Sequence, residues 1–329
     1  MGASGKKVLE AVVVGYEAAV RFAKARKMSV HRSTATGRWA GIGVAAAIAR
    51  LREFDPIQLR DAMLIAEQQG PGLLSADLHG FGGSHVKEGI AWSVVNGFFA
   101  AELSAGGFRP YPRTLDIEEL YDAGAVVSNF GDPLMIEQTF FKPYAVCRWI
   151  HCALDAFRAL LDEVNLVSSQ IQRIDVKTFE RSVRLANDPD PPDVEAAQFS
   201  IPFAIGVVAT AGADHLLPLN RDLIGNPDVS AFARRVHLAV DSECEAAFPG
   251  RTVAVVDIQT DLGRHTRRVE YPLGDPANPM DRSMLQDKFR RLAVSVLDAE
   301  NRERLIEAVA ELRRADLASV LIWLRNPIK

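Results

Sequence analysis

Three polar segments of the chain carry side chains that could move a proton or bind an anion. The first spans residues 31–37 and contains His31, Thr34 and Thr36 before a closing glycine. A histidine can gain or lose a proton near neutral pH, and hydroxyl groups can donate hydrogen bonds to an oxyanion. Serine and threonine are also common helix caps, so an ordinary cap for the following helix remains the alternative interpretation.

The second and third segments each place a lysine at the start of an expected helix. Lys87 follows His85 after a glycine-containing loop, and Lys142 precedes Pro143. A cation is disfavoured at a helix N-terminus, and a carboxylate ligand between the lysine and the free backbone amides would remove this conflict. Near Lys87 the carboxylate of Glu88 could offset the charge equally well, so both interpretations stay open.

The helix expected from Pro143 carries Cys147 and His151 four residues apart, where the two side chains share a face. A buried structural pair and a role in a site are both compatible with this spacing. A fourth segment, residues 195–203, precedes or begins another expected helix and says little alone.

Several classes of site lack their usual sequence evidence. The glycines of residues 80–83 resemble a phosphate-binding loop, but no Gly-Lys-Ser/Thr follows them. The histidines show no metal-ligand spacing, and the chain has no Gly-x-Ser-x-Gly nucleophile motif. We therefore expect no metal and no cofactor.

Composition narrows the class of protein. The 329 residues are 48% hydrophobic and carry a net charge of −4, so a large core can be buried and no basic excess points to nucleic acid. Three cysteines cannot build a disulfide framework, which favours a reducing compartment. No apolar run is long enough to span a membrane, and the N-terminus does not resemble a signal peptide. We expect a cytoplasmic protein.

The hydrophobic pattern changes twice along the chain. Helical periodicity dominates up to about residue 165, with a helix rich in alanine and glycine at residues 41–51. Alternating patterns then predict strands near residues 174–178, 236–240, 253–258 and 269–271, with a turn at residues 261–263. Helical periodicity returns after residue 280. The sequence predicts a mainly α protein with an α+β lid: residues 1–165 and 281–329 form a helical domain, and residues 166–280 form the lid.

Taken together and in this order, these segments resemble the MmgE/PrpD family, which includes 2-methylcitrate dehydratase, cis-aconitate decarboxylase and iminodisuccinate epimerase. The resemblance covers essentially the whole chain and rests on the following segments: Gly15-Tyr16-Glu17, His31 to Gly37, Lys87-Glu88-Gly89, Lys142-Pro143-Tyr144 with Cys147 and His151, Gln198-Phe199-Ser200, Gly274-Asp275-Pro276, and Lys288-Phe289.

The resemblance implies a helical domain with a smaller lid, a homodimer, and a small di- or tricarboxylate substrate bound between the domains. It implies His31, Lys87 and Lys142 as catalytic residues, the lysines holding carboxylates and the histidine carrying a proton. The candidate substrate-binding residues are Thr34, Thr36, His85 and Cys147. Cys147 stands where the decarboxylases of the family have a histidine. Dehydration, as in propionate catabolism, is therefore the first expectation, before epimerisation and decarboxylation.

The chain also differs from the family's pattern, because the usual N-terminal helical segment with its Asp-rich stretch is not recognised in it. We therefore expect either a separate small subunit that supplies this segment, as in a split enzyme, or a non-catalytic paralogue. In that case the apolar faces of the first helix and of the alanine- and glycine-rich helix would be exposed in the chain alone.

Overall fold

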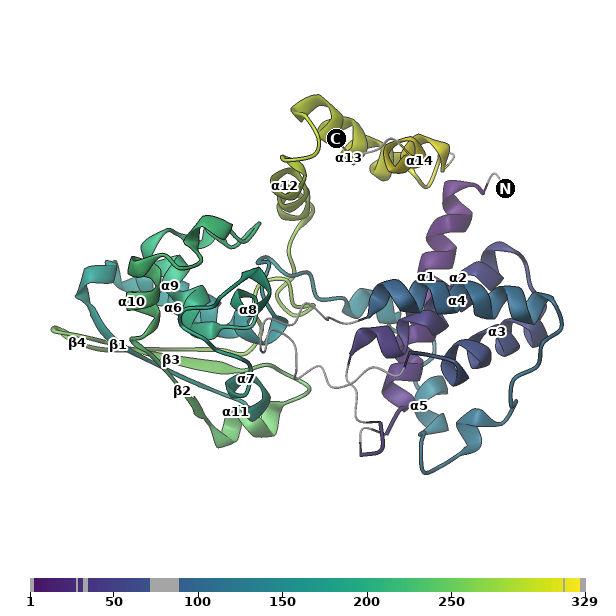
Figure 1. Ribbon diagram of the computed structural model, residues 1–329, viewed down its shortest axis with the longest axis horizontal. Helices are drawn as coiled ribbons and strands as arrows, with labels where there is room; N and C mark the ends of the chain where they lie inside the picture. Colours follow the sequence, from purple (N-terminus) through teal and green to yellow (C-terminus); the bar gives the residue numbers. More distant parts are fainter. Residues whose placement is uncertain (1–2, 28, 32–34, 72–88, 316, 326–329) are drawn as a thin grey trace. The chain divides into compact units, whose positions relative to one another are not determined.

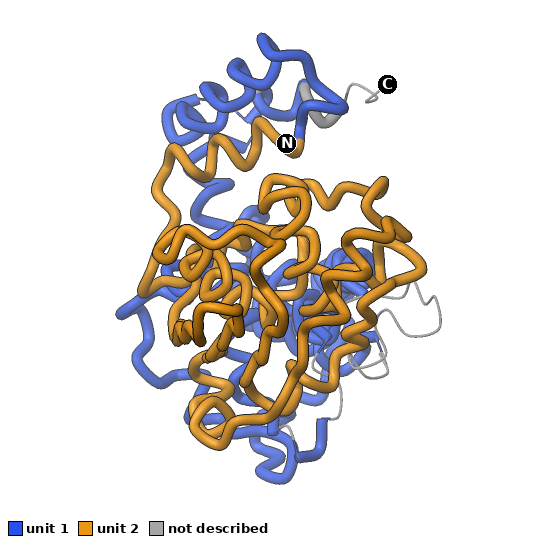
Figure 2. Tube along the Cα trace, turned by 90° about the vertical axis from the view of Figure 1, so that its left-hand side faces the viewer, with its two compact units in different colours: residues 1–76, 87–139, 293–329 blue, residues 77–86, 140–292 orange. Residues whose placement is uncertain are grey.

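The computed structural model describes residues 3–27, 29–31, 35–71, 89–315 and 317–325. Within them the chain forms two compact units (Figure 2). Unit 1 comprises residues 1–76, 87–139 and 293–329, and unit 2 comprises residues 77–86 and 140–292. Each unit has a hydrophobic core of its own.

Unit 1 is helical. Its α-helices in the described residues are α1 (Gly5–Ala25), α2 (Ala40–Leu51), α3 (Pro56–Gln68), α4 (Ile90–Ala105), α5 (Ala123–Val127), α13 (Ala299–Glu311) and α14 (Ala318–Arg325). Its short 3-10 helices are η1 (Thr36–Arg38), η4 (Thr114–Asp116) and η5 (Met135–Gln138). The backbone amide of Gly5 donates to the carbonyl of Ala315 at 3.1 Å, which joins the C-terminal segment to the start of α1.

Helix α2 lies between α1 and α4 because glycines allow the three backbones to approach closely (Figure 1). A Cβ at Gly43 would come within 2.5 Å of the carbonyl oxygen of Gly15, and one at Gly97 within 2.5 Å of the Cβ of Val44. The next helix, α3, begins at a capping box, in which Asp55 accepts from the backbone amides of Ile57 and Gln58. The small-residue pattern thus sets the spacing of the helices.

Unit 2 contains one mixed sheet with the strand order β2-β1-β3-β4. The strands are β1 (Ile171–Thr178), β2 (Val236–Val240), β3 (Ala254–Thr260) and β4 (Gly263–Val269). β1 pairs parallel with β2 and antiparallel with β3, and β3 and β4 form a hairpin whose turn lies at residues 261–262. The structure confirms three of the predicted strands and the turn. The fourth strand, predicted at residues 269–271, lies instead at Gly263–Val269.

The helices of unit 2 are α6 (His151–Val164), α7 (Glu180–Val183), α8 (Val194–Ala197), α9 (Ile201–Thr210), α10 (Pro227–Ala233), α11 (Ser242–Ala247) and α12 (Arg282–Ala293). The short 3-10 helices are η6 (Arg148–Ile150), η7 (Ser168–Gln170), η8 (Ala213–His215) and η9 (Arg221–Leu223). In Figure 1 the long helices α6 and α9 lie on one side of the sheet, and α7 and α11 lie on the other.

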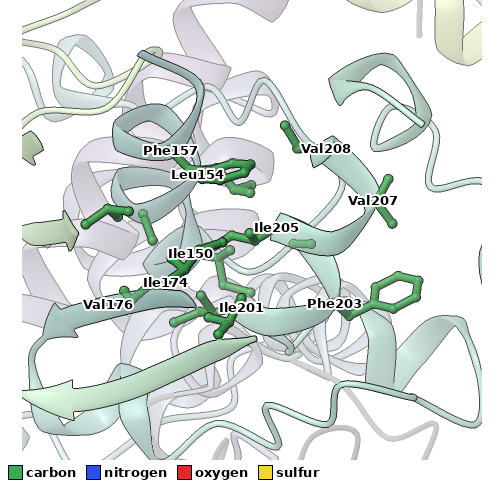
Figure 3. Close-up of a cluster of buried hydrophobic side chains, with 14 of the residues drawn as sticks. Ile150, Leu154, Phe157, Ile174, Val176, Ile201, Phe203, Ile205, Val207 and Val208 are labelled. Carbon is green, nitrogen blue, oxygen red and sulfur yellow. The ribbon is translucent and has the colours of Figure 1, made fainter. Parts of the chain in front are cut away.

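The core of unit 2 forms where α6, α9 and the sheet meet (Figure 3). Leu154 of α6, Ile174 of β1 and Ile201 and Ile205 of α9 are fully buried. Burial of one such side chain contributes about 1.5–3 kcal/mol, so these contacts fix α6 on the sheet.

The compact units do not share the boundaries predicted for the domains, 165 and 281. Helix α6 packs on β3 and β4 inside unit 2, and α12 also falls in unit 2 up to residue 292. Helical periodicity identifies a helix and its apolar face, but it does not say which neighbour covers that face.

The helix predicted from Pro143 begins later, and that prediction is wrong. Residues 142–147 are not helical, and helical structure starts with η6 at Arg148. The backbone amides that would have remained free at a helix start have distant partners: Ala145 donates to Leu216 at 2.8 Å, and Cys147 donates to Gln198 at 2.8 Å. Long-range hydrogen bonds therefore override the local preference of proline for a first turn.

The predicted exposure of apolar faces is met only in part. On α1, Val12 and Tyr16 are 44% and 40% exposed, whereas most of α2 is buried. The largest exposed aromatic side chains in unit 1 include Trp92 and Phe99 of α4, which are 70% and 64% exposed. In the described part of the chain, no helix has the length and apolar character needed to cross a membrane.

Candidate active site

His31 follows α1 in unit 1, and both of its ring nitrogens contact other groups of the protein. Nδ1 lies 2.9 Å from Nη2 of Arg26, and Nε2 lies 3.1 Å from the carbonyl oxygen of Leu120. A guanidinium only donates hydrogen bonds, so Nδ1 must accept and Nε2 must carry the proton. Burial of the ring and the charge of Arg26 lower the pKa of His31, which favours this neutral form.

Arg26 belongs to a buried cluster around Glu67. Its Nη1 donates to the two carboxylate oxygens of Glu67 at 3.0 and 3.2 Å, and the hydroxyl of Tyr121 donates to the same carboxylate. Arg38 adds a second guanidinium, with Nη2 at 3.7 Å from Oε1 of Glu67. Burial, followed by the hydrogen bond to Glu67, raises the pKa of Tyr121, so the phenol keeps its proton. The cluster therefore fixes one side of the His31 ring.

The predicted role of His31 as a proton carrier would require one of its two contacts to be exchanged for a contact with substrate. Thr36, in η1 of the same unit, lines an apolar groove of about 370 Å³ formed largely by α1 and α2. Three other predicted site residues, Thr34, His85 and Lys87, lie outside the described residues.

Lys142 lies in unit 2, in the non-helical segment before η6. Its side chain is exposed, and its ammonium donates to the carbonyl of Val146 at 3.2 Å. Lys288 of α12 approaches the same segment and donates to the carbonyl of Lys142 itself at 2.7 Å. Burial and the charge of Lys142 lower the pKa of Lys288. The ammonium groups of Lys142 and Lys288 thus both donate to backbone carbonyls of the same segment, residues 142–146.

His151, the first residue of α6, lies beside this turn and is fully buried. Its Nδ1 is within 3.1 Å of the carbonyl of Cys147 and 3.2 Å of that of Arg148, so Nδ1 carries the proton and donates. Within the described part of the chain, Nε2 has no hydrogen-bond partner. Burial, and then the positive charge of Lys142, lowers the pKa of His151 to about 4. The ring is therefore neutral at physiological pH.

A glycine-containing loop packs against the Lys142 segment. The amide of Phe141 donates to the carbonyl of Gly274 at 2.9 Å, and a Cβ at Gly274 would lie 1.8 Å from the carbonyl oxygen of Phe141. Gly274 has φ +92°, a conformation that side chains disfavour. The next residue, Asp275, pairs with Arg148 at 3.3 Å. Only glycine fits the contact between the two segments.

A second set of contacts holds Tyr144 of the same segment. The guanidinium of Arg158 donates to the hydroxyl of Tyr144. The Tyr144 ring stacks on the His151 ring, with the ring centroids 5.5 Å apart. Asp155 accepts from the amide of Leu273 at 2.7 Å, and burial raises the pKa of this carboxyl group. The segment is therefore fixed by α6 on one side and by residues 273–275 on the other.

The structure brings some of the predicted site residues together. Lys142 and Cys147 share one segment of unit 2, where the Cys147 carbonyl accepts from His151 and its side chain is half-buried. The sequence analysis missed Lys288: it was recognised only in a motif with Phe289 and received no role, because its contact with Lys142 joins residues far apart in the chain. Among the described residues, no group of three histidine, cysteine or acidic side chains is placed to hold a metal ion.

Comparison with known families gives two matches. The MmgE/PrpD N-terminal domain matches residues 1–126, and the MmgE/PrpD C-terminal domain matches residues 144–314. A comparison with curated proteins finds no match.

The two matches also correct one expectation. We expected the chain to lack the family's N-terminal helical segment, but the N-terminal domain matches from residue 1, so the claim of a missing segment is not borne out. The expectation rested on one short motif, whereas the match rests on the pattern of the whole N-terminal domain. With both domains matched along most of its length, the chain belongs to the MmgE/PrpD family.

Proposed function

We propose that this chain is a cofactor-independent lyase that removes water from a small hydroxy di- or tricarboxylate, with 2-methylcitrate as the first candidate. Membership of the MmgE/PrpD family supports a dehydratase- or lyase-type function. The observation that carries the proposal is the position of the Lys142 side chain. Its exposed ammonium has no carboxylate partner among the described residues and lies next to the neutral, buried His151. A cation presented in this way suits an anionic ligand.

The reaction would be an elimination next to a carboxylate. A base removes the proton from the carbon beside the carboxylate, whose oxygens take up the electron pair as an enediolate. The electron pair then forms the C=C bond, and the hydroxyl group leaves as water after protonation. Lys142 would hold the carboxylate and stabilise the charge that develops on it, a contribution of several kcal/mol when the donor is fixed in advance.

The remaining predicted residues keep their proposed roles. His31 would carry a proton, Lys87 would hold a second carboxylate, and Thr34, Thr36, His85 and Cys147 would contact the substrate. Epimerisation would use the same enediolate and return the proton to its other face, whereas decarboxylation would form a carbanion by loss of carbon dioxide. We place them second and third, the last because a thiol at Cys147 replaces the histidine of the decarboxylases.

A substrate panel tests the proposal. The purified chain is incubated with 2-methylcitrate, citrate and smaller hydroxy dicarboxylates in deuterated buffer, and products are identified by proton NMR. We expect a new vinyl proton signal from citrate or a smaller acid, or, from 2-methylcitrate, replacement of the methyl doublet by an allylic methyl singlet. Loss of carbon dioxide or inversion at carbon without alkene formation would replace dehydration by one of the other two reactions. If no acid changes, the chain is not a lyase for this class of substrate.

A further inference from the structure

Lys288 occupies an unusual position for a lysine of a surface helix. Its stem crosses from α12 to the Lys142 segment, and its ammonium donates to the carbonyl of Lys142 at 2.7 Å. The side chain is half-buried, so it gives up part of its hydration to reach this position. A single hydrogen bond to a carbonyl offsets only part of the free energy that partial burial of the charge costs.

Lys142 also donates to a backbone carbonyl of this segment. Its ammonium donates to the carbonyl of Val146 at 3.2 Å. Each lysine therefore commits one N–H group to a backbone carbonyl, and an ammonium has three. These carbonyl contacts limit where the two charges can be, and they leave four N–H groups that can donate to a ligand.

Neither ammonium is neutralised by a carboxylate of the described residues. Across the described ranges, no carboxylate lies within ion-pair distance of Lys142 or Lys288. Arg291, on the same helix as Lys288, shows the ordinary arrangement, since it pairs with Asp214 at 2.6 Å.

The acidic groups near the segment are already engaged. Asp275 pairs with Arg148 and also accepts from the amide of Ala277 at 3.0 Å. Asp155 accepts from the amide of Leu273 at 2.7 Å. His151, which lies beside the segment, is neutral and adds no negative charge. The positive charges of Lys142 and Lys288 repel each other, and an anion bound between them would offset this repulsion.

We propose that Lys142 and Lys288 together bind one carboxylate group of a small organic acid, with Lys288 as a second anchoring residue beside Lys142. The identity of the acid rests on the function proposed above, whereas the site itself rests on the contacts of the two lysines. A carboxylate has two oxygens, each able to accept from one ammonium, which matches a pair of donors fixed on one turn.

Calorimetric titration of the whole chain with propane-1,2,3-tricarboxylate tests this site apart from any reaction, because this acid has no hydroxyl group to lose. We expect saturable binding by the unchanged chain and about tenfold weaker binding by Lys288→Met, the loss typical of one charge-assisted hydrogen bond. Lys288→Arg, which keeps the charge, should recover most of the affinity. Lys288→Gln should bind as weakly as Lys288→Met, so the test does not depend on one variant folding.

The matched control is Lys177→Met, which removes a lysine from β1 in the same unit, where it pairs with Asp257 at 3.5 Å. It should leave the affinity unchanged. The proposal is overturned if the unchanged chain does not bind the tricarboxylate, if Lys288→Met binds it normally, or if Lys177→Met weakens binding equally. Tighter binding of inorganic phosphate than of the tricarboxylate would overturn the assignment of a carboxylate.

The outcomes separate this site from the proposed function. If hydroxy acids are not dehydrated but tricarboxylate binding depends on Lys288, the proposed function fails and the site stands. If dehydration is observed and tricarboxylate affinity does not depend on Lys288, the site fails and the function stands.

Discussion

Individual charged residues of this chain differ in how completely their neighbours neutralise them. Arg26 and Glu67 are buried together and joined by two hydrogen bonds, so removal of either would leave an uncompensated charge. Lys142 and Lys288 lack such a partner in the part of the chain that the structure describes. The first arrangement is typical of a structural cluster, and the second of a binding site.

His151 gives a pH dependence that can be measured. In the unfolded chain its pKa is roughly 6.5, whereas in the folded chain burial lowers the pKa to about 4. As the pH falls between these values, the unfolded state takes up the proton first, so the free energy of unfolding decreases. The full contribution is present above the unfolded pKa and amounts to about 3 kcal/mol.

Urea unfolding of the unchanged chain and of His151→Gln, between about pH 7 and about pH 4, measures this contribution. The unchanged chain should lose stability more steeply than the variant as the pH falls. His31 also has a lowered pKa, but it is present in both proteins and cancels in the comparison. Parallel pH profiles would show that His151 titrates alike in the folded and unfolded chains.

The sequence alone gave part of the candidate site. The position of Lys142 before Pro143, at the start of an expected helix, indicated a carboxylate-binding residue, and the family resemblance supported this interpretation. The partnership with Lys288 could not be predicted, because it depends on the path of α12 across a turn far away in sequence. The hydrogen bond of His31 to the carbonyl of Leu120 could not be predicted for the same reason, because 89 positions of the chain separate the two residues.

At the level of elements, local patterns predicted most helices and strands well. Asp55 before Pro56 correctly marked the start of α3, and alternation marked β1 and β2. The start of α6 was misplaced because the amides of residues 145 and 147 bond to other parts of unit 2. Local preference decides an element only where no distant partner competes for its backbone groups.

The contact of Gly274 with Phe141 is the element-level feature most sensitive to substitution. Gly274→Ala should destabilise the chain by about 2 kcal/mol or more, since it adds a steric clash to a strained φ. It should also weaken tricarboxylate binding, because the Lys142 segment must move. Thermal unfolding and the titration described above measure the two effects.

Gly250→Ala is the matched control for this substitution. Its added Cβ would meet only the carbonyl oxygen of Ala247 at 3.5 Å, an ordinary contact distance. We expect little change in melting temperature from Gly250→Ala. Equal effects of the two substitutions would mean that the close approach at Gly274 does not support the Lys142 segment.

For the molecule as a whole, the sequence predicted a helical part and an α+β part but did not locate the boundary. The switch from helical to alternating periodicity near residue 165 marks where strands begin. The main segment of unit 2 begins earlier, at residue 140, because α6 packs on the sheet that follows it. A change of periodicity locates secondary structure, whereas the extent of a unit is set by packing between distant segments.

The outer face of α4 bears on the homodimer that the family resemblance leads us to expect. This helix is apolar on nearly every side, and Trp92 and Phe99 are more than half exposed in the single chain. Helices of this kind are normally buried. If the second copy covers α4, Phe99→Glu should convert the dimer to a monomer in light scattering at micromolar concentration.

Leu262→Glu is the control for this prediction, since Leu262 is 87% exposed in the hairpin turn of unit 2. It should leave the dimer intact. A chain that is already monomeric without substitution, or a Phe99→Glu variant that remains dimeric, would show that α4 is not the contact between copies.

The central claim is that Lys142 holds the carboxylate of a hydroxy acid while water is removed. It is tested most directly by kcat/KM for alkene formation from the best acid of the panel, measured for the unchanged chain, Lys142→Met and Lys177→Met. We expect Lys142→Met to lose about a hundredfold, the scale of removing one charge-stabilising donor, and Lys177→Met to remain near the unchanged value. Dehydration by Lys142→Met at the unchanged rate would contradict the claim.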